Sequence, residues 1–249
     1  MKRIIPIIPT LLPSNMVMCG FTTRLGGVSL PPFDTLNLGY ETGDDQSVVK
    51  ENHTILYRFL NIDESDVAVM EQVHGTRIGV IDSGGVSPAT DGLITSSPNI
   101  MLGVKCADCI PLLLFDPAHK VAGVVHCGWR TLVNGIAEKA VNIMAAYRGT
   151  VPNDVIAAMG PSAGACCYEI GMDVARHLHP KSVNARNGQL FTDLRTELTY
   201  RLMILGLRSR NIEIIPDCTI CNEHLYFSYR RNGMKSGRIM GYIMIKSKI

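Results

Sequence analysis

Residues 104–132, VKCADCIPLLLFDPAHKVAGVVHCGWRTL, decide the fold of this chain. Two hydrophobic strands, 110–115 and 121–125, are predicted on either side of a short turn. If they pair as a hairpin, the start of the first strand lies beside the end of the second. Cys109 and His126, 17 residues apart, are then neighbours at one end of a sheet. A thiol and an imidazole gathered where strand gives way to helix indicate a functional site.

The rest of the chain mixes hairpins with single helices, which favours an α+β fold over a regularly alternating parallel one. We expect a mixed-sheet and helix sandwich, formed by residues 1–249 as a single domain. Further strands are predicted at 16–22, 67–70, 77–81, 92–95, 100–104, 155–159, 212–215, 239–245 and in YFSYRR at 226–231. Helices are predicted at 45–60, 129–147, 172–179 and 193–208.

The charge of the chain is nearly balanced, with 24 Lys and Arg against 22 Asp and Glu. A net charge of +2 gives no electrostatic argument for binding nucleic acid. No apolar run approaches the ~20 residues that span a bilayer. Prolines at positions 6, 9 and 13 argue against a signal peptide. We therefore expect a cytoplasmic protein without a membrane partner, as a monomer or a homodimer, whose eight cysteines are thiols or metal ligands.

Cysteine spacing alone predicts little. The two CxxC pairs, Cys106/Cys109 and Cys218/Cys221, are separated by more than 100 residues, which fits no compact four-cysteine zinc knuckle. A redox CxxC needs a thioredoxin-like βαβ context that is absent here. The adjacent pair at 166 and 167 is interpreted as partly buried thiols.

Three groups at strand ends indicate a metal site. His74 lies in EQVHG between two predicted strands, and by itself it is more typical of a structural polar residue. With Cys109 and His126 it completes a His-Cys-His set. Catalytic zinc commonly has three protein ligands and a fourth position open to water or substrate. The mixed thiolate and imidazole set also suits copper.

Seven ordered motifs, together with these three residues, closely resemble the YfiH-like family, once called laccase-like polyphenol oxidases and now regarded as purine nucleoside phosphorylases. The motifs, between about residues 19 and 245, are FTTRLGGVSLPPFDTLNLG, EQVHG, ATDGLIT, KCADCIPLLLFDP, VVHCGWR, GPSAGACCYEIG and FSYRRNGMKSGR.

The resemblance implies one zinc held by His74, Cys109 and His126. It also implies cleavage of adenosine, inosine and methylthioadenosine with phosphate, releasing base and ribose 1-phosphate, and deamination of adenosine. Some members have been linked to editing wrongly built peptidoglycan precursors. The chain departs from the family pattern at Cys106, Cys127 and Thr131, beside the ligands. These cysteines are candidates for altering the surroundings of the metal or for competing as ligands.

Phosphorolysis needs a positioned phosphate, which calls for arginine and backbone N–H donors. The candidates are Arg24, Arg130 and Arg230, each equally consistent with a structural ion pair. Asn37 is a candidate for binding ribose or base, although a turn Asn is the ordinary interpretation. Asp108 is a candidate for orienting His126 or moving a proton, or for capping the backbone.

The leading hypothesis is a zinc-dependent purine nucleoside phosphorylase with accessory adenosine deaminase activity. One alternative is a Cys–His hydrolase, an amidase or an enzyme editing peptidoglycan precursors, with Cys109 as the nucleophile and His126 as its base. A copper-dependent phenol oxidase is another, although the chain has few His and Cys ligand clusters for several coppers. A non-catalytic, partner-binding protein is the last.

Overall fold

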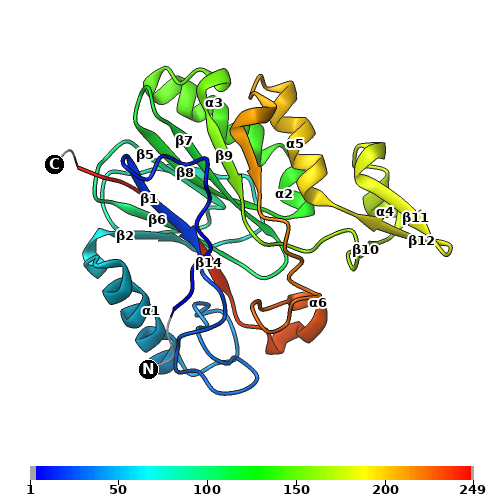
Figure 1. The fold of residues 1–249 in the computed structure, drawn as a ribbon, viewed down its shortest axis with the longest axis horizontal. Coiled ribbons are helices and arrows are strands. Elements are labelled where there is room, and N and C mark those ends of the chain that lie inside the picture. Colours follow the sequence, from blue (N-terminus) through cyan, green and yellow to red (C-terminus); the bar gives the residue numbers. More distant parts are fainter. Residues whose placement is uncertain (1–3, 248–249) are drawn as a thin grey trace.

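Two stacked sheets organise the computed structural model, which describes residues 4–247 (Figure 1). The six-stranded sheet has the order β13 (Ile212–Ile214), β9 (Ile156–Met159), β7 (Ile110–Asp116), β8 (Val121–Cys127), β5 (Gly92–Thr95), β3 (Ile78–Val80). The five-stranded sheet has the order β1 (Val17–Phe21), β14 (Ile239–Ile245), β6 (Met101–Cys106), β2 (Val67–Met70), β4 (Gly85–Ser87). Both sheets mix parallel and antiparallel pairs.

The hairpin β7–β8 lies at the centre of the molecule because both of its faces are covered. Leu113 and Phe115 point toward the five-stranded sheet, in a core between the two sheets. Leu112 and Leu114 point the other way, toward the helices α3 (Ile136–Arg148) and α5 (Leu194–Ile204). A strand buried on both faces reads as a continuous apolar run, which explains the unbroken sequence IPLLLF.

The outer face of the five-stranded sheet is covered by α1 (Gln46–Leu60), whose Leu56 and Tyr57 pack on Met101 and Tyr242. The molecule therefore has four layers, with α1 on one side and α3 and α5 on the other (Figure 1). This confirms the predicted mixed-sheet and helix sandwich. Asp45 caps α1, with its side chain accepting the backbone N–H of Ser47.

The helix predicted over 129–147 is wrong as a single element. It is divided into α2 (Trp129–Val133) and α3, because Gly135 adopts a left-handed φ of 79°. The helix predicted at 193–208 is capped by Asp193 but ends at Ile204, shortly before the left-handed Gly206. The strand predicted in YFSYRR is also wrong. Its second half forms α6 (Tyr229–Asn232), where the hydroxyl of Ser228 accepts the N–H of Arg231.

A small third sheet, which the sequence did not predict, projects from one side of the molecule (Figure 1). It consists of β10 (Glu169–Ile170), β12 (Gln189–Thr192) and β11 (Val183–Arg186), next to α4 (Met172–Ala175). The helix predicted at 172–179 is thus a single turn. Short 3₁₀ helices lie at Glu64–Asp66, Pro152–Asp154, Pro180–Ser182, Ser209–Asn211 and Gly233–Lys235.

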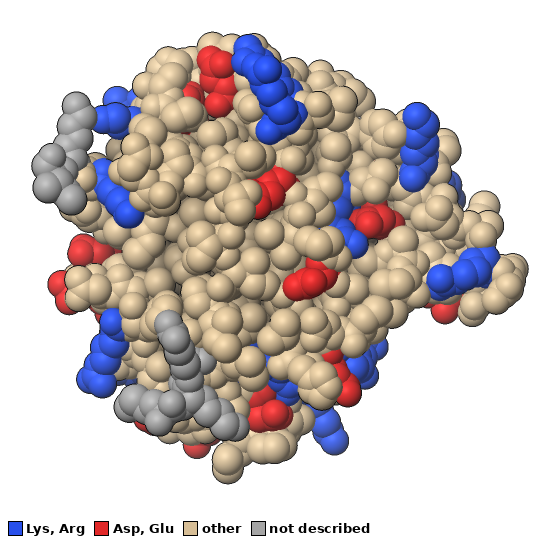
Figure 2. Space-filling model, in the orientation of Figure 1, with Lys and Arg blue, Asp and Glu red and all other residues tan. Residues whose placement is uncertain are grey.

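The surface carries scattered charge. On the face shown in Figure 2, Lys and Arg lie singly among Asp and Glu, with wide uncharged areas between them. This agrees with the balanced composition, and that face offers no continuous basic surface for nucleic acid. None of the helices in residues 4–247 combines the length and the apolar character that crossing a bilayer requires.

Candidate metal centre and adjoining pocket

The central hairpin brings Cys109 and His126 together as its sequence predicts. Ile110 pairs with Cys127 and Pro111 with His126, so Cys109 stands directly before β7 at the end of β8. The backbone of Gly128 passes close to the thiol, since a side chain there would place its Cβ 2.9 Å from Cys109 Sγ. The glycine of HCGWR therefore leaves the room that the sulfur needs.

His74 reaches the same place from the turn that follows β2. It has a left-handed φ of 56°, and its ring lies 4.7 Å, centroid to centroid, from the ring of His126 in an edge-on arrangement. The His74 side chain is exposed, Cys109 is half-buried and His126 is buried. One ligand atom from each of the three residues lies within 4.8 Å of the others. The three side chains that the sequence predicted as metal ligands therefore converge.

A fully buried carboxylate, Asp91, orients this set. Its Oδ1 lies 2.9 Å from His126 Nδ1, and it accepts the backbone N–H groups of Val73, His74 and Gly75 at 3.2, 3.0 and 2.7 Å. Because Nδ1 of His126 is engaged, Nε2 is the nitrogen left for a metal. A carboxylate behind a ligating histidine fixes the ring and raises its basicity. This arrangement fits a zinc or copper ion with an open side.

The electrostatics of the three residues are linked. Burial opposes ionisation of Cys109, but the adjacent His126 and His74 lower the pKa of its thiol to about 6. Burial also opposes charge on His126, yet the Cys109 thiolate and Asp91 raise the pKa of its imidazole to about 9. Asp91 is buried too, and its hydrogen bonds from His126 and the 73–75 turn lower its pKa. A thiolate and an imidazolium are therefore the stable forms near neutral pH without a metal.

Asp91 was missed from the sequence, although it stands in the motif ATDGLIT. It comes directly before β5, and β5 pairs antiparallel with β8, with Gly92 opposite Val125. The backbone N–H of His126 accordingly donates to the carbonyl of Asp91 at 2.8 Å. Only this strand pairing shows that Asp91 lies behind His126.

Asp108, predicted beside the ligands, lies in the pocket wall with a left-handed φ of 83°. Its Oδ1 accepts the hydroxyl of Thr219 at 2.6 Å, and its Oδ2 accepts the hydroxyl of Ser228 at 3.0 Å and the N–H of Arg230 at 2.7 Å. It thus ties the 108 turn to the 219 loop and to α6. The carboxylate that contacts His126 is Asp91.

The two additional cysteines of this region are buried thiols. Burial raises the pKa of Cys106 and Cys127 well above the ordinary value, and the charge of Cys109 adds to the effect. Neither belongs to the group whose ligand atoms converge with His74. The hydroxyl of Thr131 accepts the N–H of Gly128 and donates to the carbonyl of His126, both at 2.9 Å, so it supports the chain next to the ligand.

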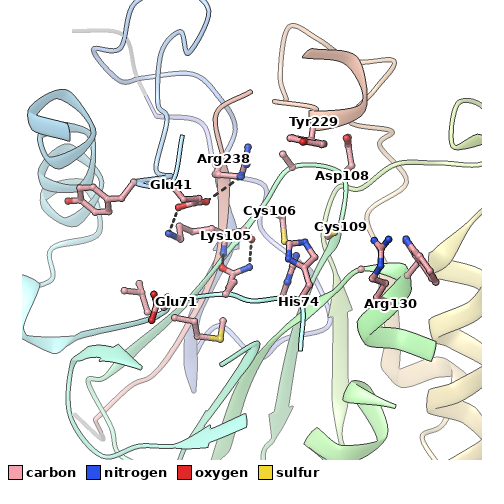
Figure 3. Close-up of a pocket in the computed structure, with 18 of the residues that line it drawn as sticks. Glu41, Glu71, His74, Lys105, Cys106, Asp108, Cys109, Arg130, Tyr229 and Arg238 are labelled. Atoms are coloured by element: carbon pink, nitrogen blue, oxygen red, sulfur yellow. Dashed lines mark hydrogen bonds and ion pairs between the residues drawn. The ribbon is translucent and has the colours of Figure 1, made fainter. Parts of the chain in front are cut away.

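The candidate metal site opens into a cavity of about 1220 Å³ (Figure 3). Glu41 forms ion pairs with two of its cations, with Oε2 at 2.8 Å from Lys105 Nζ and Oε1 at 3.3 Å from Arg238 Nε. The other charged residues and the aromatic residues of the lining are Glu71, Asp108, Arg130 and Arg230, and Tyr40, Trp129, Tyr168 and Tyr229. Figure 3 shows Arg130 on the side of Cys109, and Glu41 with its two cations on the other side of His74.

Arg130 and Arg230, both predicted as phosphate ligands, lie in this lining. The Arg130 guanidinium covers the ring of Trp129 at 4.4 Å, and that of Arg230 covers Tyr168 at 4.8 Å. Among residues 4–247, neither guanidinium has a carboxylate within 4.0 Å. Both charges are therefore free for an anion.

Arg24 and Asn37 are outside the residues that line the cavity. Arg24 donates to the carbonyl of Asp34 at 2.6 Å, to its carboxylate at 3.0 Å and to the carbonyl of Glu223 at 2.9 Å. Asn37 is fully buried, and its Nδ2 donates to Thr42 and Asp44 while its Oδ1 accepts the N–H groups of Gly39 and Arg238. The contacts of both side chains shape the loop before α1.

Comparison with known proteins agrees with this geometry. A sequence profile described as multi-copper polyphenol oxidoreductase laccase matches residues 18–246. The purine nucleoside phosphorylase YlmD of Bacillus subtilis is 33% identical, over 92% of this chain and 89% of its own. A purine nucleoside phosphorylase of Corynebacterium glutamicum is 36% identical, over 90% and 93%.

Among solved structures, the hypothetical protein YfiH of Bacillus licheniformis superimposes with a TM-score of 0.89 at 31% identity, covering 95% of this chain and 98% of that one. YlmD of Geobacillus stearothermophilus superimposes with a TM-score of 0.88 at 30% identity, covering 93% and 92%. The chain therefore belongs to the YfiH-like family of laccase-domain proteins.

Proposed function

We propose that this chain is a metal-dependent purine nucleoside phosphorylase, which cleaves adenosine, inosine or methylthioadenosine with phosphate into base and ribose 1-phosphate. One observation carries the proposal: the His74–Cys109–His126 set shares a cavity with two arginines that have no carboxylate partner within residues 4–247. The relatives named as purine nucleoside phosphorylases support it over nearly the whole chain.

Arg130 and Arg230 are the proposed phosphate ligands. A guanidinium binds phosphate oxygens through two parallel N–H bonds, and these two are held in place by stacking on Trp129 and Tyr168. Lys105 and Arg238 are less suited, because both are already engaged in ion pairs with Glu41. In the reaction a phosphate oxygen forms a bond to C1′ of the ribose as the bond from C1′ to the purine breaks, so the phosphate must be held against the sugar.

Tyr229 is the proposed platform for the purine. It begins α6 at the cavity wall, and 48% of its surface is exposed, whereas Tyr226 and Phe227 are buried in the core. A flat aromatic face next to cationic groups suits a purine ring. Of the aromatic side chains in YFSYRR, only Tyr229 is therefore free to meet a ligand.

Zinc is the proposed ion, with copper as the alternative, because a His-Cys-His set is a known form of a zinc site. When bound, zinc supplies Lewis-acid stabilisation of negative charge on a ligand atom. The chain contributes the thiolate of Cys109, the nitrogen of His126 that Asp91 leaves free, and an exposed His74 at the cavity side. Eight thiols suit the reducing cytoplasm, where we place the protein.

Adenosine deamination is part of the proposal as an accessory activity. It needs a carboxylate that can move a proton. The carboxylate of Asp108 already accepts three hydrogen bonds, whereas the Glu71 side chain is exposed in the same cavity and has no hydrogen bond within residues 4–247. We therefore assign the proton-carrying role to Glu71 in preference to Asp108.

The test uses purified protein of known metal content, with adenosine and inosine supplied separately, with and without phosphate. We expect base release that requires phosphate and yields ribose 1-phosphate in equal amount. Inosine formed from adenosine without phosphate measures deamination independently. Base release at the same rate without phosphate would indicate a hydrolase, and no turnover by metal-loaded protein would favour a non-catalytic, partner-binding role.

A second candidate is a Cys–His hydrolase, favoured by the lowered pKa of Cys109 next to His126 and Asp91. A thiolate beside an imidazolium that a carboxylate orients is the arrangement of cysteine nucleophiles. Iodoacetamide separates the two proposals. Alkylation of Cys109 while the bound metal is retained supports the nucleophile, and protection of Cys109 by the metal supports the ligand.

A copper-dependent phenol oxidase has less support. Within residues 4–247 histidine takes part in one convergent ligand group, and the other group consists of cysteines alone. An oxidase with several coppers requires more imidazole ligands than this.

A further inference from the structure

Four cysteines outside the hairpin converge at the surface of the molecule. The sulfurs of Cys166, Cys167, Cys218 and Cys221 all lie within 4.8 Å of one another. Cys221 Sγ is 3.1 Å from Cys167 Sγ and 3.3 Å from Cys166 Sγ. The CxxC pair at 218 and 221 therefore meets the adjacent pair at 166 and 167, while Cys109 belongs to the first site and Cys106 is a buried thiol outside both groups. The interpretation of the adjacent pair as partly buried thiols is wrong for Cys166, which is exposed.

The sheet topology explains how the two loops meet. Strands β9 and β13 are parallel neighbours, so their carboxyl ends leave the sheet side by side. The pairing continues beyond the sheet, where Ser162 bridges to Cys218 and the N–H of Thr219 donates to the carbonyl of Ser162 at 3.0 Å. After this bridge the chain turns in the loop that follows β9 and in the loop that follows β13. The 166–167 pair therefore lies next to the 218–221 turn.

The chemistry of four gathered thiols is that of a metal site. We propose that Cys166, Cys167, Cys218 and Cys221 hold one Zn²⁺ as a closed, structural site. Four thiolates are a common ligand set for structural zinc, and Zn–S bonds of about 2.3 Å set the sulfurs of a tetrahedron about 3.8 Å apart. The observed spread needs shifts of roughly 1 Å or less, at side chains on surface loops, to reach that geometry.

Two contacts favour a shared ion over a disulfide. Cys221 lies almost equally close to Cys166 and Cys167, whereas a disulfide joins two sulfurs and leaves the other two as thiols. The backbone N–H of Gly164 donates to Cys218 Sγ at 3.3 Å, a hydrogen bond that stabilises a thiolate. Cysteine is also among the most buried residue types, so a group with two exposed members needs a reason.

The proposed site would stabilise two loops that support the wall of the catalytic cavity. Tyr168, directly after Cys167, lies under the Arg230 guanidinium in the lining. Thr219, directly after Cys218, donates its hydroxyl to Asp108 at 2.6 Å, and its carbonyl accepts a hydrogen bond from Arg231 in α6. The ion would thus hold together the two loops that position Tyr168 and Asp108, without itself facing the substrate.

The zinc content per chain tests the proposal directly. Protein made with zinc and purified reduced, without chelator, is expected to hold two Zn²⁺ per chain. The single variant Cys221→Ser and the double variant Cys166→Ser/Cys221→Ser are expected to hold one, and their melting temperature falls. Since Cys221 lies on an exposed turn, the single variant is expected to fold. Cys19→Ala, which removes a buried thiol outside both groups, is the matched control and keeps two ions.

Cobalt replaces zinc as a visible probe. In the His74→Ala variant, whose first site is disabled, Co²⁺ is expected to give the strong thiolate-to-cobalt and tetrahedral d–d bands of a four-sulfur site, and these bands vanish when Cys221→Ser is added. This result does not depend on phosphorolysis. One zinc in both wild type and Cys221→Ser, fewer than eight titratable thiols after unfolding in chelator, or an iron–sulfur spectrum would each overturn the proposal.

Discussion

Asp91 and His126 form the contact on which the candidate metal centre depends. Asp91 Oδ1 lies 2.9 Å from His126 Nδ1, and the same buried carboxylate holds the three backbone N–H groups of the turn that carries His74. One side chain therefore sets the positions of two of the three proposed ligands.

Asp91→Asn should lower metal affinity by roughly 10–100-fold, the usual effect of removing a carboxylate behind a ligating histidine. The NH2 group of the Asn side chain would also face the backbone N–H donors that Asp91 accepts, and a donor cannot pair with another donor. The unfolding free energy should therefore fall by about 1–3 kcal/mol. Competition with a chelating dye and denaturant unfolding measure the two effects. Asp82→Asn, at an exposed carboxylate, is the control. An unchanged metal affinity in Asp91→Asn would contradict the proposed role of Asp91 in orienting His126.

His74→Ala, Cys109→Ala and His126→Ala should each lose one zinc per chain relative to wild type, together with activity, while remaining folded. Their stabilities in chelator should differ. His74 is exposed, so its loss should change the unfolding free energy by no more than about 0.5 kcal/mol. His126→Ala takes a donor from buried Asp91 and should cost about 1–3 kcal/mol. A variant that keeps its full metal content would exclude that residue as a ligand.

Metal binding at this site should release about one proton near pH 7.5. Without metal, Cys109 has a pKa of about 6 and is a thiolate, whereas His126 has a pKa of about 9 and is protonated. The ion must displace the His126 proton, so its affinity should rise about tenfold per pH unit between pH 7 and 9 and level off above that. Calorimetry in two buffers of different ionisation enthalpy counts the proton. The Cys221→Ser variant confines the titration to this site, and an affinity independent of pH would contradict the charge assignment.

Arg130→Ala and Arg230→Ala should raise the KM for phosphate by roughly 10–100-fold, the value of a charge-assisted hydrogen bond of about 1.5–3 kcal/mol. The KM for nucleoside should change less. Arg24→Ala provides the contrast, because Arg24 binds Asp34 and the carbonyl of Glu223 outside the cavity lining. It should lower stability and leave the KM for phosphate unchanged. If Arg24→Ala raised the KM for phosphate while Arg130→Ala and Arg230→Ala did not, phosphate would bind at the loop before α1 instead.

Gly135→Ala should destabilise the protein by about 1–2 kcal/mol, because φ of 79° is costly for a residue with a Cβ. Gly43→Ala, at a residue without a left-handed φ and with ordinary contacts, should be close to neutral. Thermal unfolding compares the two. If Gly135→Ala were neutral, α2 and α3 would be able to join into the one helix that the apolar spacing predicts.

The central hairpin and its two ligands could be predicted because the information is local. Two apolar runs and a turn fix the pairing, and the pairing brings Cys109 to His126. The break between α2 and α3 at Gly135 could not be predicted, because glycine is tolerated within many helices and only its left-handed φ shows that the helix is interrupted there.

What the sequence could not supply depends on contacts between distant segments. Asp91 reaches His126 only through the pairing of β5 with β8, and Cys166 meets Cys221 only because β9 and β13 are parallel neighbours. Arg24 and Arg130 look alike in sequence, although one is engaged with Asp34 and the other faces an open cavity. The partners of a side chain, more than its type, separate a structural arginine from a binding one.

Because β7 and β8 are covered by a layer on each face, the strands that carry Cys109 and His126 stay in place whether or not an ion is present. The chain should therefore be able to fold first and to bind the proposed metal ion afterwards. Chain that lacks the ion would then already be folded, and it should become active once the ion enters through the open cavity.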